Sequence, residues 1–240
     1  MTPSPASTID QNEINHFQQF ADTWWDESGT YAALHQMNPV RLGYIQDHMS
    51  RHFGKVAGIS VLDVGCGGGL ICEPMTRLGA KMTGVDACLE NIECATAHAS
   101  SQGLDIDYRH TAVEQVEESF DVVIASEIIE HVANPQAFIE ACSKRLKPNG
   151  LLFISTLNRT HKSYLLGIIA AEHILRWAPK GTHDWNKFIT PEELQIMLKA
   201  AGLTTADLAG MEYSPLRARW KLGDSDAINY IAVATSQEHK

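Results

Sequence analysis

The architecture of this chain follows from one short stretch, Val61-Leu62-Asp63-Val64-Gly65-Cys66-Gly67-Gly68-Gly69. The apolar residues predict a buried strand, and the glycines after it predict a tight turn that leads into a helix. In an open α/β sheet, a strand, a glycine turn and a helix in this order hold the ligand. A dinucleotide fingerprint, G-x-G-x-x-G, needs glycine at position 70, where Leu70 stands. The pattern is therefore G-x-G-x-G, and Leu70 together with Asp63 disfavours a dehydrogenase.

Two acidic residues at predicted strand ends indicate the kind of ligand. The carboxylate of Asp63, beside the glycine turn, would repel a pyrophosphate and attract an ammonium group. Asp86 ends the next predicted strand, where an acid accepts hydrogen bonds from both ribose hydroxyls. An adenosine that carries an amino-acid end is S-adenosylmethionine, so we expect this cofactor. The glycine turn and Asp86 resemble the first two motifs of the class I S-adenosylmethionine-dependent methyltransferases.

Short apolar segments alternate with longer amphipathic segments over residues 60–155. This alternation predicts parallel βαβ units with helices on both faces of the sheet. Two last strands, near 203–209 and 227–235, are expected to pair antiparallel through a hairpin-like connection. The expected fold class is α/β, with a doubly wound, mostly parallel, seven-stranded Rossmann-like sheet. The alternating segments are Ser60–Val64, Leu70–Leu78, Met82–Val85, Leu89–Ser101, Ile106–Arg109, Asp121–Ala125, Pro135–Leu146 and Leu151–Ser155.

The length of 240 residues predicts one domain. Residues 1–9 are expected to form a disordered tail, and residues 10–240 the single methyltransferase domain. Helical spacing over 10–55 predicts an N-terminal helical cap, with Asn38-Pro39 as a helix start. The alternation stops over 156–190, which we expect to be a helical insertion after the fifth strand. It resumes at Thr190-Pro191-Glu192-Glu193, a predicted helix N-terminus.

Charge and cysteine content exclude several classes of function. The chain has 19 Lys and Arg against 29 Asp and Glu, a net charge of −10, and such a surface repels nucleic acid. Five cysteines without a CxxC pair predict free thiols in a reducing compartment, and argue against a disulfide framework or a zinc site built on cysteine. The sequence contains no predicted targeting segment or membrane span, so we expect a cytoplasmic protein.

Further segments, spread over roughly 17–230, are similar to one family, the ubiquinone biosynthesis O-methyltransferases. They are Trp24-Trp25-Asp26, Leu34-His35, Asn38-Pro39-Val40-Arg41-Leu42-Gly43-Tyr44-Ile45, Glu127-Ile128-Ile129-Glu130-His131-Val132, Ser155-Thr156-Leu157-Asn158-Arg159, Pro179-Lys180-Gly181-Thr182-His183-Asp184 and Asn229-Tyr230.

The resemblance implies methyl transfer to phenolic hydroxyls of polyprenylated catechol intermediates, 2-polyprenyl-6-hydroxyphenol and 3-demethylubiquinol. It also implies that Arg41 helps to bind the cofactor, and it raises association with other enzymes of the pathway as an expectation. Ser126 departs from the family pattern, in which a methionine is expected in bacterial relatives. The expected cofactor-binding residues are Arg41, Asp63, Gly65, Gly67, Gly69, Asp86, Ala112, Val113 and Ser126, with Ala112 and Val113 flanking the adenine at the end of the third strand.

Methyl transfer requires an ionised oxygen. A free phenol has a pKa of about 10, so its ionisation at neutral pH costs roughly 4 kcal/mol, which a general base or a bound cation can remove. His131, directly after the fourth strand, is a candidate base, with Glu130 beside it. An equal alternative is that His131 only caps a helix through a backbone carbonyl.

The spacing E-x-x-E-H brings Glu127, Glu130 and His131 to one side of a helical turn. Such ligands suit Mg²⁺, Mn²⁺ or Zn²⁺, and a catechol could complete the metal's coordination. The resemblance to the family also implies that this enzyme could depend on a metal, because its eukaryotic members resemble metal-dependent enzymes. The alternative is an exposed acidic turn with one structural histidine.

A polyprenyl substrate lies in the bilayer, and the insertion is the candidate for reaching it. Its apolar stretch has an aromatic residue at each end and basic residues beside it, which is typical of an interfacial helix in contact with membrane lipid. The alternative is a lid helix that packs on the domain. The residues expected to contact lipid or substrate are Leu165, Ile168, Ile169, Trp177, Lys180 and His183.

Two other functions remain open at this stage. One is an O-methyltransferase for a different, soluble phenol, which would need the same glycine turn but no affinity for lipid. The other is a non-catalytic, cofactor-binding member of a biosynthetic complex, which would bind the cofactor without turnover.

Overall fold

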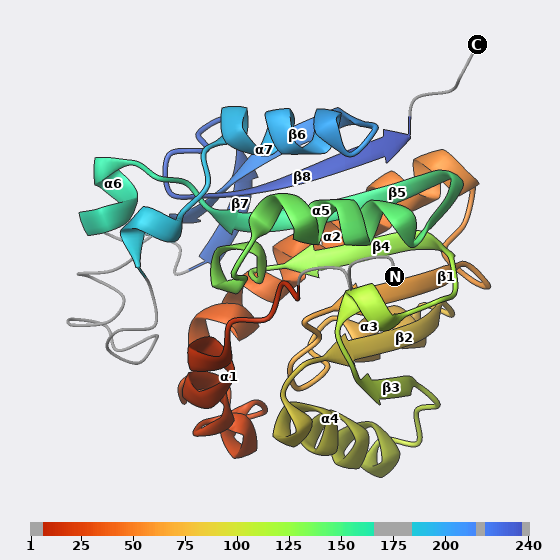
Figure 1. Cartoon of the computed structure of the whole chain (residues 1–240). Coiled ribbons are helices and arrows are strands. Elements are labelled where there is room, and N and C mark those ends of the chain that lie inside the picture. The colour runs from red at the N-terminus through yellow and green to blue at the C-terminus, as the bar shows by residue number, and fades with distance from the viewer. Residues whose placement is uncertain (1–6, 166–183, 215–218, 237–240) are drawn as a thin grey trace, which may run out of the picture.

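A computed structural model describes residues 7–165, 184–214 and 219–236 of the chain. Its centre is an eight-stranded sheet with the strand order β3-β2-β1-β4-β5-β8-β6-β7 (Figure 1). The strands are β1 (Ser60–Val64), β2 (Lys81–Asp86), β3 (Asp107–His110), β4 (Phe120–Ser126), β5 (Leu146–Leu157), β6 (Leu203–Ser214), β7 (Arg219–Gly223) and β8 (Asn229–Ser236).

The first five strands are parallel, with β1 between β2 and β4. The carboxyl ends of these strands therefore meet at one edge of the sheet, where an open α/β fold binds its ligand. The predicted α/β class with a mostly parallel sheet is confirmed.

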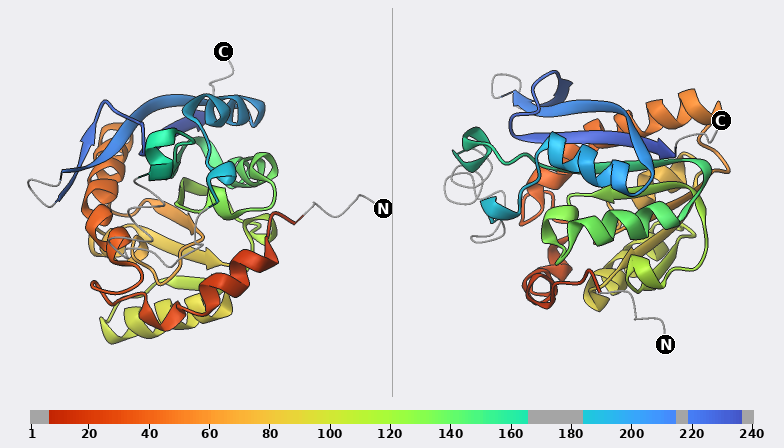
Figure 2. Two further views of the ribbon diagram at one scale, coloured as in Figure 1. Left: turned by 90° about the vertical axis from the view of Figure 1, so that its left-hand side faces the viewer. Right: turned by 45° about the horizontal axis from the view of Figure 1, so that its top comes forward.

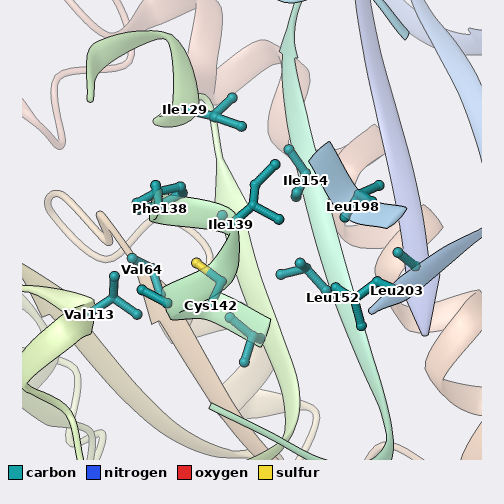
Figure 3. Packing of buried hydrophobic residues seen from close by; sticks show 14 of the residues in the cluster. Val64, Val113, Ile129, Phe138, Ile139, Cys142, Leu152, Ile154, Leu198 and Leu203 are labelled. Atoms are coloured by element: carbon teal, nitrogen blue, oxygen red, sulfur yellow. The ribbon is translucent and has the colours of Figure 1, made fainter. Parts of the chain in front are cut away.

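Helices cover both faces of the sheet (Figures 1 and 2). On one face, α5 (Pro135–Lys144) and α7 (Pro191–Ala200) pack over strands β4, β5 and β8. Figure 3 shows this core, in which Phe138 and Ile139 of α5 and Leu198 of α7 lie beside Leu152 and Ile154 of β5.

On the other face, α2 (Ala32–Phe53) and α3 (Cys72–Arg77) bury apolar side chains against the same strands. α4 (Leu89–Ser101) contacts β2 and β3. Alternate residues of β5 face the two cores: Leu152 and Ile154 belong to the first, Leu151 and Phe153 to the second. This alternation is expected of a strand with helices on both sides.

Short elements connect these layers at the carboxyl edge. Helix α1 (Gln11–Gln18) and the 3-10 turn η1 (Ala21–Thr23) precede α2. The turns η2 (Val113–Gln115) and η3 (Ile129–His131) follow β3 and β4, and α6 (His161–Ser163) and η5 (Trp185–Lys187) follow β5.

The strand count and one strand connection differ from the prediction. The sheet has eight strands rather than seven, because the segment between the last two expected strands contains β7, which pairs antiparallel with β6. β8 then returns antiparallel between β5 and β6. β7 is a strand of five residues at the sheet edge. Its polar and apolar residues alternate, but Leu222 is exposed, and so short a pattern did not reveal the strand.

The predicted helix start at Asn38-Pro39 is wrong. Helix α2 begins at Ala32 and continues through Pro39. A proline inside a helix removes one backbone hydrogen bond. Tertiary packing outweighs that loss here, because Met37, Tyr44, Ile45 and Met49 of α2 are all buried.

The N-terminus of α7 follows the prediction. Thr190 Oγ1 accepts a hydrogen bond from the backbone N–H of Glu193 at 3.2 Å, and the Glu193 carboxylate accepts one from the Thr190 N–H at 3.0 Å. This reciprocal capping box satisfies two of the free donors at the helix end.

Thr8, at the end of the expected N-terminal tail, is buried. Its N–H donates to Glu114 Oε1 at 2.7 Å, and its carbonyl accepts from the N–H of Ala133. Among the described residues, no helix has the length and apolar character needed to cross a membrane.

Candidate active site

The glycine turn between β1 and α3 has a backbone that only glycine adopts without strain. Gly65, Gly67 and Gly69 have φ angles of 69°, 53° and 89°. A Cβ atom on Gly67 would lie 2.4 Å from the ring of Trp24, and one on Gly69 would lie 2.2 Å from the Tyr108 hydroxyl. Gly67 thus allows the N-terminal cap to cover the turn, and Gly69 allows the turn to pack on β3.

A cavity of about 400 Å³ lies over this turn at the carboxyl edge of the sheet. Its volume is within the range of small-molecule sites. Phe20, Trp24 and Tyr31 from the N-terminal cap line it, with Trp24 and Tyr31 stacked at 3.7 Å between ring centroids. The residues predicted as functional that also line it are Gly65, Gly67, Asp86, Ala112, Val113, Ser126, Glu127, Glu130 and His131.

Asp86 is held at the end of β2 by backbone donors. Its Oδ2 accepts from the N–H of Gly67 at 2.9 Å, and its Oδ1 accepts from the N–H of Cys88 at 2.8 Å. The side chain therefore fixes the glycine turn and presents its carboxylate to the cavity. Asn91, which also donates to Asp86, accepts at its Oδ1 from Trp24 Nε1 at 2.8 Å, so the cap is tied to the same acid.

Arg41 and Asp63 form a charged layer behind the cavity wall. The Arg41 side chain comes from α2 and is 2% exposed. It donates to Ser126 Oγ at 2.9 Å and to the Leu34 carbonyl at 3.1 Å, and its Nε lacks a partner among the described residues. A buried guanidinium with an unused donor fits the carboxylate of an amino-acid ligand.

Burial raises the pKa of Asp63 to about 7, although the Cys72 thiol donates to it at 3.3 Å and the Arg41 charge acts in the opposite direction. A carboxyl group that titrates near neutrality is poised to become ionised when a cationic group arrives.

Glu127 begins the segment that follows β4, and its backbone is strained. Its φ angle is 54°, unusual for a residue with a side chain and typical of functional loops. Glu127 Oε2 accepts from Asn229 Nδ2 at 2.9 Å. Glu127 Oε1 and Asn229 Oδ1 are buried and have no hydrogen-bond donor within the described part of the chain. The pair thus offers two free acceptors at the cavity wall.

Glu130 is buried behind Glu127. Burial, followed by the negative charge of Glu127, raises the pKa of Glu130 to about 8. Thr156 Oγ1 donates to Glu130 Oε2 at 2.8 Å. The carboxyl group of Glu130 is therefore mostly neutral at pH 7, when it can act as a donor as well as an acceptor.

His131 contacts the N-terminal cap. Its Nδ1 lies 2.9 Å from Glu13 Oε2, and Phe17 meets the ring edge to face at 4.9 Å between centroids. The partner of this nitrogen is thus a carboxylate and not the backbone carbonyl of the structural alternative. Burial acts to raise the pKa of Glu13, but hydrogen bonds from His131 and Lys187 outweigh it and lower that pKa to about 2.

The residues of the predicted cation site are not gathered around one point in this structure. Where side chains are described, no three or more His, Cys, Asp or Glu residues are grouped so that they could hold a metal ion. Glu127, Glu130 and His131 share the cavity wall, but they are directed to separate partners, Asn229, Thr156 and Glu13. The spacing E-x-x-E-H is read on a continuous helix, whereas here Glu127 precedes the short turn η3 and has a left-handed backbone.

Most of the predicted insertion lies outside the described residues. This applies to Ile168, Ile169, Trp177, Lys180 and His183. Leu165, the remaining residue of that set, is 56% exposed.

Two residues of the site were missed by sequence analysis. Glu13 precedes His131 by 118 positions, and Asn229 follows Glu127 by 102. In the sequence, Asn229 stands out only as part of a segment that is similar to the family. Glu13 lies in a segment with ordinary helical spacing, which gives it no special role. No local spacing links either residue to its partner.

Comparisons with known proteins agree with this site. Residues 37–208 match a family model described as a methyltransferase domain. The magnesium protoporphyrin IX methyltransferase from Synechocystis, solved with bound SAH, superposes with a TM-score of 0.67 at 16% identity, covering 94% of this chain and 100% of that one. This similarity confirms the class I methyltransferase fold.

Two curated relatives are much closer in sequence, and both are named ubiquinone biosynthesis O-methyltransferase. The protein from Bradyrhizobium diazoefficiens is 46% identical over 242 residues, which is 97% of this chain and 96% of the relative. The protein from Parvibaculum lavamentivorans is 47% identical over 238 residues, which is 95% of this chain and 94% of the relative. Identity at this level along the whole chain confirms the resemblance, and the chain belongs to the family of ubiquinone biosynthesis O-methyltransferases.

Proposed function

We propose that this protein transfers a methyl group from S-adenosylmethionine to a phenolic hydroxyl of polyprenylated catechol intermediates of ubiquinone biosynthesis, 2-polyprenyl-6-hydroxyphenol and 3-demethylubiquinol. The observation that carries the proposal is the near-full-length identity of 44–47% to relatives with that name. The cavity at the sheet edge supports the proposal, because residues expected to bind the cofactor, such as Gly67 and Asp86, line the same cavity as the candidate base His131.

The residues around the glycine turn fit the cofactor. Asp86 would accept from the ribose at Oδ2, which keeps a lone pair beyond its bond from the Gly67 N–H, whereas Oδ1 already accepts from Cys88 and Asn91. Asp63 would attract the ammonium group, and the unused Nε donor of Arg41 would serve the carboxylate. Ala112 and Val113 would flank the adenine, as the position of both in the cavity wall allows.

His131 is the proposed general base. When bound, S-adenosylmethionine supplies a methyl group on a cationic sulfur, and the carbon–sulfur bond breaks with its electron pair passing to sulfur. The imidazole takes the proton of the phenol, so the oxygen attacks the methyl carbon as an anion. The products are the aryl methyl ether and S-adenosylhomocysteine, and the imidazolium returns its proton to solvent.

The other polar groups of the cavity suit a catechol. Glu127 Oε1 and Asn229 Oδ1 are the two acceptors that lack donors, and the hydroxyls of a catechol would supply them. Glu130, with a pKa of about 8, keeps a second negative charge away from the phenolate at neutral pH. A fully ionised pair of glutamates would repel that anion.

We also propose that the segment 156–190 gives access to the polyprenyl tail, as an interfacial helix on anionic lipid or as a lid. The exposed Leu165 at its described end is consistent with either role. Association with other enzymes of the pathway stays an expectation from the family.

The test is methyl transfer from labelled S-adenosylmethionine to a short-chain prenylated catechol, with the same catechol lacking the tail as the control substrate. We expect turnover of the prenylated compound, with a lower KM than for the control. Equal use of both compounds would favour a soluble phenol as substrate. Cofactor binding without turnover would favour the non-catalytic function, and a parallel assay with chelator and restored Mg²⁺ reports any metal requirement.

A further inference from the structure

Helix α1 places a carboxylate against the ring of His131. We propose that Glu13 is a positioning residue for methyl transfer, which holds His131 in the tautomer and orientation that a base requires. This inference rests on the proposed function, in which His131 accepts the phenol proton. Glu13 itself acts through the imidazole.

The contact is short and sheltered. Glu13 Oε2 lies 2.9 Å from His131 Nδ1, and the two side chains are only 20% and 8% exposed. A hydrogen bond to a charged group at such a site is stronger than one in open solvent. Phe17, one turn further along α1, packs its ring against the imidazole and limits its rotation.

The chemistry of the carboxylate selects one tautomer. An ionised glutamate is only an acceptor, so it requires a proton on His131 Nδ1. In the neutral ring, the lone pair then lies on Nε2, the nitrogen that must receive the proton of the substrate. Without Glu13, the neutral ring could carry its proton on either nitrogen, and only one of the two forms is a base at Nε2.

A second partner holds Glu13 in place and keeps it charged. Lys187 Nζ donates to Glu13 Oε1 at 2.8 Å, so each oxygen of the carboxylate has its own partner. Lys187 also contacts Asp10 Oδ2 at 3.2 Å, which ties η5 to the start of α1. The Glu13–His131 pair joins α1 to η3, and Lys187 joins η5 to the same carboxylate.

The charged and titratable groups around the imidazole come from three elements. Glu13 is in direct contact, Asp10 and His16 line the same cavity, and Lys187 contacts both Glu13 and Asp10. Glu127 and Glu130 line the cavity from the side of β4. Glu13 Oε2 is hydrogen-bonded to the ring at Nδ1.

The experiment compares E13Q with D10N in the full-length protein. Asp10 is the N-cap residue of the same helix and binds the same lysine, and asparagine keeps the hydrogen bond that Asp10 accepts from the Asn12 N–H. We expect kcat of E13Q to fall by about tenfold or more, because glutamine can offer the ring an amide donor instead of an acceptor. KM for both substrates should stay within about twofold in E13Q, and D10N should keep the wild-type kcat.

A spectroscopic measurement tests the tautomer directly, even if E13Q does not fold. In the wild-type protein labelled with ¹⁵N-histidine, the His131 ring should be neutral and protonated on Nδ1 at the pH of maximal turnover. Protonation on Nε2 alone, or on both nitrogens, would overturn the inference.

H131A separates this inference from the proposed function. If H131A and E13Q both retain full kcat, the assignment of the base fails and the inference fails with it. If H131A loses turnover while E13Q matches the wild type in kcat, only the role of Glu13 is overturned. A loss in D10N equal to that in E13Q would indicate that docking of α1, rather than the carboxylate at Glu13, accounts for the effect.

Discussion

At the scale of single residues, the carboxyl groups of the site differ in their surroundings: one lies beside basic side chains and two are buried. Glu13 is held by two basic side chains and has a pKa of about 2, whereas Asp63 and Glu130 are buried and have pKa values of about 7 and 8. The difference follows from burial and from the distance to a cation. One acid is thus permanently charged, and two change state near neutral pH.

Asp63 predicts a pH dependence of cofactor binding. Below pH 7 its carboxyl group is protonated in the free protein, while the ammonium group of S-adenosylmethionine favours the ionised form. Binding therefore releases a proton below pH 7, and the dissociation constant should rise as pH falls, by up to about tenfold per pH unit. Calorimetry in two buffers of different ionisation enthalpy measures both quantities.

The control for this dependence is D63N, which removes the titrating group but retains the shape of the side chain. We expect weaker binding with a much flatter pH profile between pH 5.5 and 7. The same slope in D63N and the wild type would assign the dependence to another group, with Asp86 as the first candidate because its pKa is also raised by burial.

At the scale of elements, the turn between β1 and α3 and the cap above it are built as one unit. Trp24 covers Gly67 and Gly68, and Trp25 Nε1 donates to the carbonyl of Gly68 at 3.0 Å. The cap can approach this closely because the turn has no side chains on that side. The N-terminal helices therefore form one wall of the cofactor cavity.

This packing predicts different costs for two glycine substitutions. G67A and G103A both place a side chain at a positive φ, 53° and 66°, and this backbone strain alone should lower the free energy of unfolding by about 1 kcal/mol in each. A steric clash adds to that loss in G67A. A Cβ at Gly103 has nothing within 4 Å, whereas one at Gly67 lies 2.4 Å from Trp24.

We expect G67A to weaken S-adenosylmethionine binding by about tenfold or more, which corresponds to at least about 1.4 kcal/mol, and G103A to leave it unchanged. Thermal denaturation with and without cofactor measures both effects. Equal cofactor affinity in the two variants would contradict the close contact between the cap and the turn.

At the scale of the whole molecule, the sheet shelters the thiols. All five cysteines are free, and Cys66, Cys72, Cys88 and Cys142 are buried while Cys94 is partly exposed. The predicted free thiols are thus confirmed. Burial raises the pKa of the Cys66 and Cys88 thiols to about 11, so few of them are ionised at neutral pH.

Thiol titration of the native protein should reflect this arrangement. Burial raises the pKa of the Cys94 thiol as well, so its partial exposure is what distinguishes it. We expect Cys94 to react first with a disulfide reagent at pH 7.5, and all five thiols to react after denaturation. C94S is the control and should abolish the fast phase. Rapid reaction of two or more thiols in the folded protein would contradict the burial of the glycine turn and α3.

Local sequence patterns were sufficient for the fold class and for the place of the glycine turn at the carboxyl edge of the sheet. The glycine turn, Asp63 and Asp86 lie at strand ends, and the ends of neighbouring parallel strands meet at one edge of the sheet for any sequence with this alternation. The position of Ala112, Val113 and Ser126 at the same edge follows for the same reason.

The acceptor side of the cavity depends on contacts between distant segments. The pairs Glu13–His131 and Glu127–Asn229 form because α1 docks across the sheet edge and β8 returns between β5 and β6. The residues of the predicted metal triad do not share one helical face, since Glu127 has a left-handed backbone. The spacing of residues in the sequence indicates which side chains share a face of one helix or strand. The way in which α1 and β8 pack against the rest of the molecule depends on contacts along the whole chain. Only the tertiary structure therefore revealed these partners.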